Sequence, residues 1–112
     1  MIITKSEPFT VAEIEKLKER FEIYIKTVID IKNNSCSAGM DRHFEGEVIL
    51  LSQGSSQSQI WGGGIDLETK EIDFNSFINI RPNDNNTKNE IQSETIKDKY
   101  KELTEHFFQA II

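Results

Sequence analysis

The residues of this chain that could do chemistry fall in two segments, and the first runs from residue 41 to residue 47. Asp41 and His43 are followed by Glu45 and Glu47. Carboxylates beside an imidazole can ligate a divalent metal ion, or can place a general base next to an orienting carboxylate. The spacing matches no strong metal-binding pattern, and Asp41 is also consistent with the cap of a helix. Both interpretations remain open at the level of the sequence.

The second segment is a stretch of strand without side chains. Trp61 is followed by Gly62, Gly63 and Gly64. Glycine weakens a strand by roughly 0.5–1 kcal/mol per residue relative to alanine, so three in succession need a reason. One reason is packing of an aromatic ring such as Phe77 across the glycines. The other is the close approach of a ligand or of another backbone. No phosphate-binding glycine spacing is present.

The glycines belong to a predicted β-hairpin with strands over 60–67 and 72–81. The turn between them pairs Leu67 with Ile72, and alternation then gives the second strand one apolar face formed by Ile72, Phe74, Ile78 and Ile80. The opposite face carries glycines, carboxylates, amides and a cation. A slip of one residue would exchange the two faces, so the pattern specifies which face is buried. We therefore expect an apolar side against the core and a polar side free to bind.

Charged and amide side chains occupy the polar side of this hairpin. Asp66 is predicted to lie opposite Asp73, a like-charge pair that a lysine or a bound cation would relieve. Arg81 has the planar fork that binds a carboxylate or a phosphate, with the Asn79 amide beside it. The alternative is an ordinary solvated face with weak surface ion pairs.

Periodicity predicts the elements that position these residues. Helices are expected over 11–21, 42–53 and 94–110, and a half-buried strand over 23–31. In the second helix the apolar spacing is that of Phe44, Val48 and Leu51, and residues 36–40 are interpreted as a loop of small residues. The order of elements predicts an α+β fold, with a small, mainly antiparallel sheet packed on one face by three helices.

Composition sets limits on the class of protein. The chain has 112 residues, 37% apolar and 29% charged, which predicts one globular domain over 1–112. The net charge is −6, and no cluster of Lys and Arg suits nucleic acid or an anionic membrane. One cysteine, Cys36, cannot form an internal disulfide, which favours a cytoplasmic location. A lone cysteine is more often a small core residue than a nucleophile.

Three motifs carry a resemblance to a known family: Cys-Ser-Ala-Gly-Met-Asp at 36–41 with His43, Trp-Gly-Gly-Gly-Ile-Asp at 61–66, and Ile-Asn-Ile-Arg-Pro at 78–82. With them, the chain resembles a small family of uncharacterised microbial proteins, a domain of unknown function, over essentially its whole length. The resemblance implies no activity. It implies that the following residues belong to motifs: Asp41, His43, Trp61, Gly62, Gly63, Gly64, Asp66, Asn79 and Arg81.

The leading hypothesis is a cytoplasmic binding domain, in which these motif residues hold a small polar or anionic ligand or a partner chain. The competing hypothesis is a metal-assisted hydrolase, with Asp41, His43 and Asp66 binding the ion and Glu45 or Glu47 acting as base. A third hypothesis is a homodimer formed through apolar surface at the C-terminus, from Phe107, Phe108, Ala110, Ile111 and Ile112. The sequence specifies neither a cofactor nor a substrate.

Overall fold

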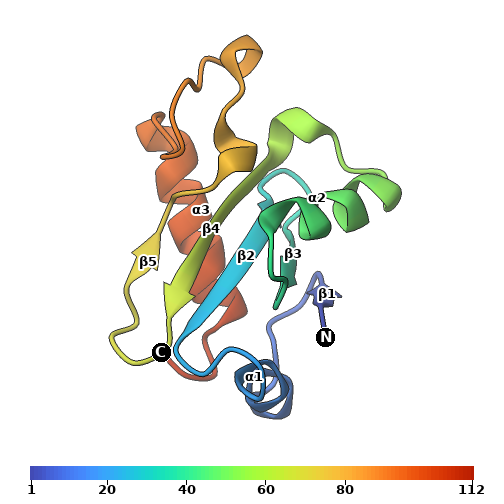
Figure 1. Ribbon diagram of the computed structural model, residues 1–112, viewed down its shortest axis with the longest axis vertical. Helices are drawn as coiled ribbons and strands as arrows, with labels where there is room; N and C mark the ends of the chain where they lie inside the picture. Colours follow the sequence, from blue (N-terminus) through green and yellow to red (C-terminus); the bar gives the residue numbers. More distant parts are fainter.

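The computed structural model describes all 112 residues, and its centre is a five-stranded antiparallel sheet in the order β1-β3-β2-β4-β5 (Figure 1). The strands are β1 (Ile3–Lys5), β2 (Tyr24–Asp30), β3 (Ser35–Ala38), β4 (Ile60–Asp66) and β5 (Ile72–Asp73). The helices are α1 (Val11–Lys18), α2 (His43–Ser52) and α3 (Glu94–Phe107), with 3-10 turns η1 (Gln57–Gln59), η2 (Phe77–Asn79) and η3 (Pro82–Asp84). The predicted α+β fold is confirmed. None of the helices combines the length and the apolar character needed to cross a membrane.

Helices α1 and α3 begin at the predicted residues, 11 and 94, each after a capping side chain. The Thr10 hydroxyl accepts a hydrogen bond from the Glu13 amide at 3.1 Å, and the Glu13 carboxylate accepts one from the Thr10 amide at 2.9 Å. The Ser93 hydroxyl accepts a bond from the Ile96 amide at 3.3 Å. These side chains satisfy amides that the first turn of a helix leaves without partners.

Two strands of the sheet, β1 and β3, were not predicted. β3 lies in the segment interpreted as a small-residue loop. It pairs with β2 on one side, where Cys36 lies opposite Ile29, and with β1 on the other. All four residues of β3 are buried. Its side chains are too similar in size to show the alternation that identifies a half-buried strand.

The hairpin is shorter than predicted, and its register differs by two residues. Ile65 lies opposite Ile72 and Gly64 lies opposite Asp73, so Asp66 does not face Asp73. A shift of two residues preserves which side chains share a face. The second strand ends at Asp73 instead of continuing to residue 81. Asp73 accepts a hydrogen bond from the Asn75 amide at 3.0 Å, and such local bonds compete with a strand ladder.

The sheet is covered on both faces, whereas the sequence predicted three helices on one face. α3 and α1 cover one face, and Ile25, Ile29 and Trp61 belong to the main core on that side. α2 covers the other face, where Val28 and Ile60 belong to a smaller core. Figure 1 shows α2 and α3 on opposite sides of β2 and β4. β2 is therefore buried on both faces along its second half.

Helix α2 faces the sheet with a different side from the one its spacing suggests. Gly46 and Leu50 are its buried residues, whereas Phe44, Val48 and Leu51 are exposed. A Cβ at Gly46 would lie 2.6 Å from Met40 Cε and 3.0 Å from Val28 Cγ2. The missing side chain lets the helix lie close to the sheet.

The apolar C-terminus is largely internal. Phe107 and Phe108 are fully buried, and their rings lie 5.8 Å and 5.2 Å from that of Phe9. Ile111 packs partly on the same core, and Ile112 is exposed. The C-terminal surface that suggested a homodimer is therefore mostly part of the core.

Candidate functional site

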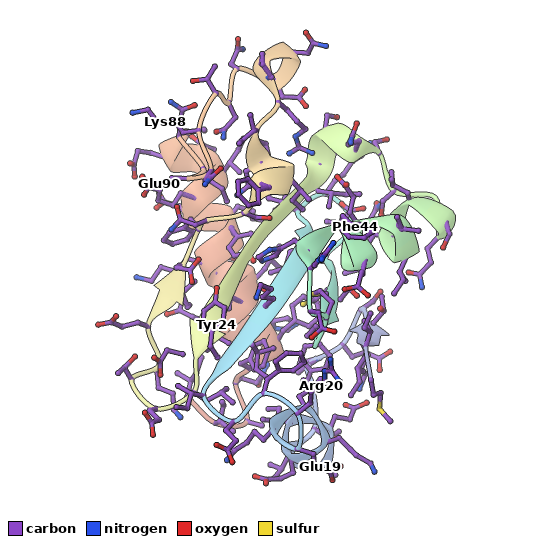
Figure 2. The ribbon with its side chains drawn as sticks, in the orientation of Figure 1. Glu19, Arg20, Tyr24, Phe44, Lys88 and Glu90 are labelled. Atoms are coloured by element: carbon purple, nitrogen blue, oxygen red, sulfur yellow. The ribbon has the colours of Figure 1, made fainter.

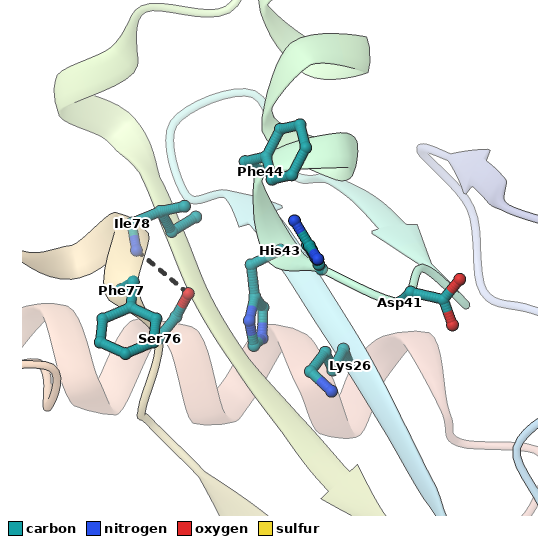
Figure 3. Close-up of a pocket in the computed structure, with 8 residues that line it drawn as sticks. Lys26, Asp41, His43, Phe44, Ser76, Phe77 and Ile78 are labelled. Carbon is teal, nitrogen blue, oxygen red and sulfur yellow. Dashed lines mark hydrogen bonds between the residues drawn. The ribbon is translucent and has the colours of Figure 1, made fainter.

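A pocket lies on the α2 face of the sheet, between the start of α2 and η2 (Figure 3). Its volume is about 420 Å³. β2 contributes one lining residue from the sheet, the α2 region contributes four, and the segment after β5 contributes three: Lys26, Asp41, Arg42, His43, Phe44, Ser76, Phe77 and Ile78. The pocket therefore brings together three segments that are far apart in the sequence.

His43 is the first residue of α2 and lies between Phe77 and Lys26 in the pocket (Figure 3). Its Nε2 lies 2.7 Å from the carbonyl oxygen of Gly63. A carbonyl only accepts, so Nε2 carries the proton and Nδ1 keeps its lone pair when the ring is neutral. Burial lowers the pKa of His43, the Lys26 charge adds to this, and the Gly63 bond opposes it. The ring is thus held in its neutral form and in one tautomer.

Asp41 lines the pocket but is not the cap of α2. The residue before the helix is Arg42, whose amide donates to the Glu45 carboxylate at 2.9 Å. Arg20, which follows α1 (Figure 2), donates two hydrogen bonds to Asp41, at 2.9 Å and 2.7 Å. The guanidinium holds the pKa of the Asp41 carboxyl below its usual range. The single acidic residue of the pocket is therefore already paired.

The remaining charges of the pocket are positive. Lys26 projects from β2, and Arg42 precedes α2, which places both near the positive end of the helix dipole. Neither side chain forms an ion pair with a carboxylate. Asp73, the nearby carboxylate on β5, accepts a hydrogen bond from the Tyr24 hydroxyl at 2.5 Å. The pocket consequently has two free cations in a chain whose net charge is −6.

Other parts of the chain fill the spaces above the three glycines. A Cβ at Gly62 would lie 2.8 Å from Ser76 Cβ and 3.1 Å from His43 Cδ2. A Cβ at Gly64 would lie 2.1 Å from the Tyr24 hydroxyl. At Gly63, on the opposite face, it would lie 2.9 Å from the Tyr100 ring and hydroxyl. The structure therefore supports packing as the reason for the three glycines. The rings that pack there are those of Tyr24, His43 and Tyr100 and not that of Phe77.

Asn79 has no access to solvent and acts inside the fold. Its Oδ1 accepts from the Gly62 amide at 2.9 Å, and its Nδ2 donates to the Gly62 carbonyl at 2.9 Å. The same Nδ2 lies 3.2 Å and 2.9 Å from the carbonyl oxygens of Phe74 and Asn89. The carboxamide thus pairs with Gly62 of β4 as a peptide group of the neighbouring strand would, at a point where β5 has already ended.

The other motif residues lie away from the pocket. Trp61 is buried in the main core, and the Arg81 guanidinium stacks on its ring at 4.2 Å. Arg81 donates to the carbonyl oxygens of Gln57 and Ile60, the latter at 2.7 Å. Burial lowers the pKa of Arg81, partly offset by Asp84. Asp66 lies at the opposite end of β4 from Ile60, so its carboxylate does not contact the Arg81 guanidinium.

A family model described as a protein of unknown function (DUF5674) matches residues 1–107. The chain belongs to the DUF5674 family. The predicted resemblance to a domain of unknown function is confirmed at this level. No significant match was found among curated proteins or among solved structures.

The proposed metal ligands of this DUF5674 member do not converge. Asp41 is bound by Arg20, and Asp66 accepts hydrogen bonds from the Glu68 and Thr69 amides at 2.8 Å and 3.0 Å in the turn after β4. No group of three or more His, Cys, Asp or Glu side chains is arranged to hold a metal ion. The geometry therefore does not support the metal-assisted hydrolase hypothesis.

Cys36 also lacks the surroundings of a nucleophile. It is fully buried in β3, and its thiol contacts the Ser37 carbonyl at 3.8 Å. Burial raises the pKa of the Cys36 thiol, which keeps it protonated. The interpretation of Cys36 as a small core residue agrees with this position.

Sequence reasoning identified two of the pocket residues, Asp41 and His43, and missed six. The missed residues are Lys26, Arg42, Phe44, Ser76, Phe77 and Ile78. Alternation along β2 places Lys26 on the face opposite Ile25, which is the face that carries the pocket. No local signal showed that α2 and η2 would meet above it.

Proposed function

We propose that this DUF5674 member is a binding domain whose pocket at the start of α2 holds a small anionic molecule with a planar apolar part. The observation that carries the proposal is the pair of unpaired cations, Lys26 and Arg42, in a pocket whose one acidic residue is bound by Arg20. The chain as a whole is acidic, so this local excess of positive charge is opposite in sign to its surroundings.

The electrostatics favour an anion at one end of the pocket. The Lys26 ammonium is a half-buried donor, and the first turn of α2 adds the positive end of its dipole. The neutral His43 ring already donates through Nε2, so its Nδ1 can only accept a hydrogen bond. A ligand with an O–H or N–H donor at that position is therefore favoured. A phosphate or carboxylate beside a hydroxyl or amino group fits this set.

The other end of the pocket is apolar. Phe77 of η2 is 81% exposed and Phe44 of α2 is half exposed, although both are large aromatic residues. Ile78 adds an aliphatic wall and packs partly on the smaller core. Aromatic faces on the rim of a mainly apolar pocket suit a planar ring.

The experiment is a titration of the intact protein by calorimetry and by NMR. The probes are phenyl phosphate and AMP, with phenol and adenosine as their uncharged counterparts. The two anions should bind and shift the amides of His43, Phe44 and Ser76, whereas the uncharged compounds should bind more weakly. Equal affinity for charged and uncharged probes would remove the electrostatic basis of the proposal.

A matched pair of variants assigns the effect to the pocket. Lys26→Gln should weaken phenyl phosphate binding by about tenfold or more, because a hydrogen bond to a charged group contributes roughly 1.5–3 kcal/mol. Lys101→Gln changes the same charge beside a separate hollow next to β5 and α3 and should leave the affinity unchanged. If the two variants lose affinity equally, the anion is not bound at α2.

We also propose that the protein works in a reducing cytoplasmic compartment. Its single cysteine, Cys36, is buried and cannot take part in a disulfide without unfolding of the sheet. Cell fractionation of a source that expresses the chain tests this, and recovery from an oxidising compartment would contradict it.

A further inference from the structure

The imidazole of His43 has one ring nitrogen that the fold leaves free. Its Nε2 bonds the Gly63 carbonyl at 2.7 Å, and its Nδ1 forms no hydrogen bond. The side-chain polar atoms that are both buried and unpaired are Trp61 Nε1 and Arg81 Nε, so Nδ1 of His43 is in contact with solvent. The ring lines the pocket beside Lys26 (Figure 3). A reagent that enters the pocket can therefore reach a basic nitrogen.

The surroundings of His43 suit a nucleophile, which needs a lone pair that is not occupied by a proton. The Gly63 carbonyl can only accept, so it keeps the proton of the neutral ring on Nε2 and leaves the lone pair on Nδ1. Burial lowers the pKa of His43, and the Lys26 charge adds to this, so the neutral ring predominates at neutral pH. Nδ1 is thus ready to attack without prior loss of a proton.

Three groups that can bind phosphoryl oxygens line the same pocket. Lys26 and Arg42 form no ion pair with a carboxylate. The Ser76 hydroxyl accepts from a backbone amide at 3.2 Å, so its own proton is free to donate. Ser76 lies next to the ring, because a Cβ at Gly62 would be 2.8 Å from Ser76 Cβ and 3.1 Å from His43 Cδ2. Cations and donors placed in this way stabilise the charge of a phosphoryl group during its transfer.

We propose that His43 is a phosphorylation site, at which Nδ1 accepts the phosphoryl group of an N-phosphoryl donor, a phosphoramidate, held in this pocket. The inference rests on the proposed function, since the donor must first bind there as an anion. The Nδ1 lone pair forms a new N–P bond while the N–P bond of the donor breaks. The electron pair of the broken bond leaves with the donor nitrogen, which departs as ammonia when the donor is phosphoramidate itself. Nε2 keeps its proton, and no further reactant is needed.

The class of donor follows from the bond that is formed. A phosphorylated imidazole loses its phosphoryl group more readily than a phosphate ester does, because the neutral ring is a better leaving group than an alkoxide or a phenoxide. Phenyl phosphate and AMP should therefore bind without transfer, whereas an N-phosphoryl donor exchanges one N–P bond for another. A donor whose nitrogen belongs to a ring would also place that ring against the exposed faces of Phe44 and Phe77.

The first test is incubation of the full chain with phosphoramidate, with the phosphoryl group located by mass spectrometry and phosphorus NMR. The chain has two histidines, and the other one, His106, is exposed near the end of α3 and serves as an internal control. His43 should react about tenfold or more faster than His106, because the pocket positions the donor and stabilises its charge. An excess of phenyl phosphate should slow the reaction of His43 alone. Equal rates at the two histidines would overturn the proposal.

The second test separates recognition of the phosphoryl group from simple accessibility of the ring. Diethyl pyrocarbonate acylates imidazole and carries no charge, so the cations do not attract it. The ratio of the His43 rate to the His106 rate should be about tenfold higher with phosphoramidate than with this reagent. Lys26→Gln should remove most of that difference, and Lys101→Gln should preserve it, with circular dichroism confirming that both variants are folded. Equal ratios for the two reagents in the unaltered chain would show that His43 is only reachable, and would refute its role as a phosphoryl acceptor.

The outcomes distinguish this inference from the proposed function. If phenyl phosphate binds at α2 and His43 shows no preference for phosphoramidate, the pocket binds anions without accepting a phosphoryl group, and only this inference is wrong. If phenyl phosphate does not bind and His43 also reacts no faster than His106, both are wrong.

Discussion

Replacement of Asn79 by alanine should strongly destabilise the protein. The carboxamide is the partner of both the amide and the carbonyl of Gly62, and it also bonds the carbonyl oxygens of Phe74 and Asn89. All of these contacts are at 2.9–3.2 Å, and Asn79 and Gly62 are buried. Alanine removes the side chain and leaves these backbone groups without partners.

The magnitude follows from the number of bonds. Nδ2 has two protons for three carbonyl oxygens, so the side chain makes three full hydrogen bonds, counting the one that Oδ1 accepts. A buried backbone group left unsatisfied costs about 1–3 kcal/mol. Partial access of water to the vacated space reduces the sum. We therefore expect a loss of about 3–6 kcal/mol in the free energy of unfolding, against the 5–15 kcal/mol typical of a domain.

Urea denaturation followed by tryptophan fluorescence measures this loss. Trp61 is the only tryptophan, is buried, and is adjacent to Gly62, so its emission reports on this part of β4. The midpoint should fall while the slope with urea stays the same. Asn83→Ala is the matched control, because Asn83 is exposed in the same region, and it should change the free energy by less than about 0.5 kcal/mol. A loss below about 1 kcal/mol for Asn79→Ala would refute the reasoning that the side-chain amide supplies the missing hydrogen-bond partners of β4.

Three further outcomes are expected. Gly63→Ala should lower the free energy of unfolding by about 2–3 kcal/mol in the same urea assay, because the new Cβ would lie 2.2 Å from the backbone oxygen of Asp73, and an unchanged midpoint would contradict this. The pKa of His43 is lowered in the fold, so the unfolded state binds the proton first and stability should fall as pH decreases through about 6.5. His43→Gln should flatten this dependence between pH 7 and 5, and an unchanged slope would exclude the assignment. Burial raises the pKa of Cys36, so a thiol reagent should modify it only at the rate of unfolding, and rapid modification of the native protein would disprove that burial.

The predictable part of the fold is the part with strong periodicity. β2 follows from its alternating residues, and α1 and α3 follow from their caps and apolar stripes. β3 could not be identified, because Ser35 to Ala38 have no contrast between large and small side chains. The end of β5 depends on Asp73 and Ser76, whose side chains bond nearby amides in place of a strand ladder.

The orientation of α2 shows why spacing alone was misleading. Phe44, Val48 and Leu51 have the spacing of a buried stripe, yet Gly46 and Leu50 face the sheet. When a helix has apolar residues on two opposite sides, the sequence pattern does not show which side faces the core. The informative residue was Gly46, because a glycine in the middle of a helix indicates a close approach to another element.

The candidate site was only partly predictable for a related reason. Asp41 and His43 both line the pocket, and their closeness in the chain is what let the sequence group them. Lys26 and Phe77 join them only through the crossing of β2, α2 and η2, which no local pattern encodes. The polar groups attributed to a ligand face were used by the protein itself: Asn79 bonds Gly62, and Arg81 bonds backbone carbonyls beside Trp61.

The two outer strands of the sheet are very short, and this has a consequence for how the molecule behaves at high concentration. β1 has three residues and β5 has two, and beyond β5 the carboxamide of Asn79 occupies the hydrogen-bonding groups of Gly62. An incoming extended segment therefore finds few free amides and carbonyls in register along either border. The sheet offers little template for strand-by-strand polymerisation, so fibril growth from the native state should first require the 74–80 segment to detach.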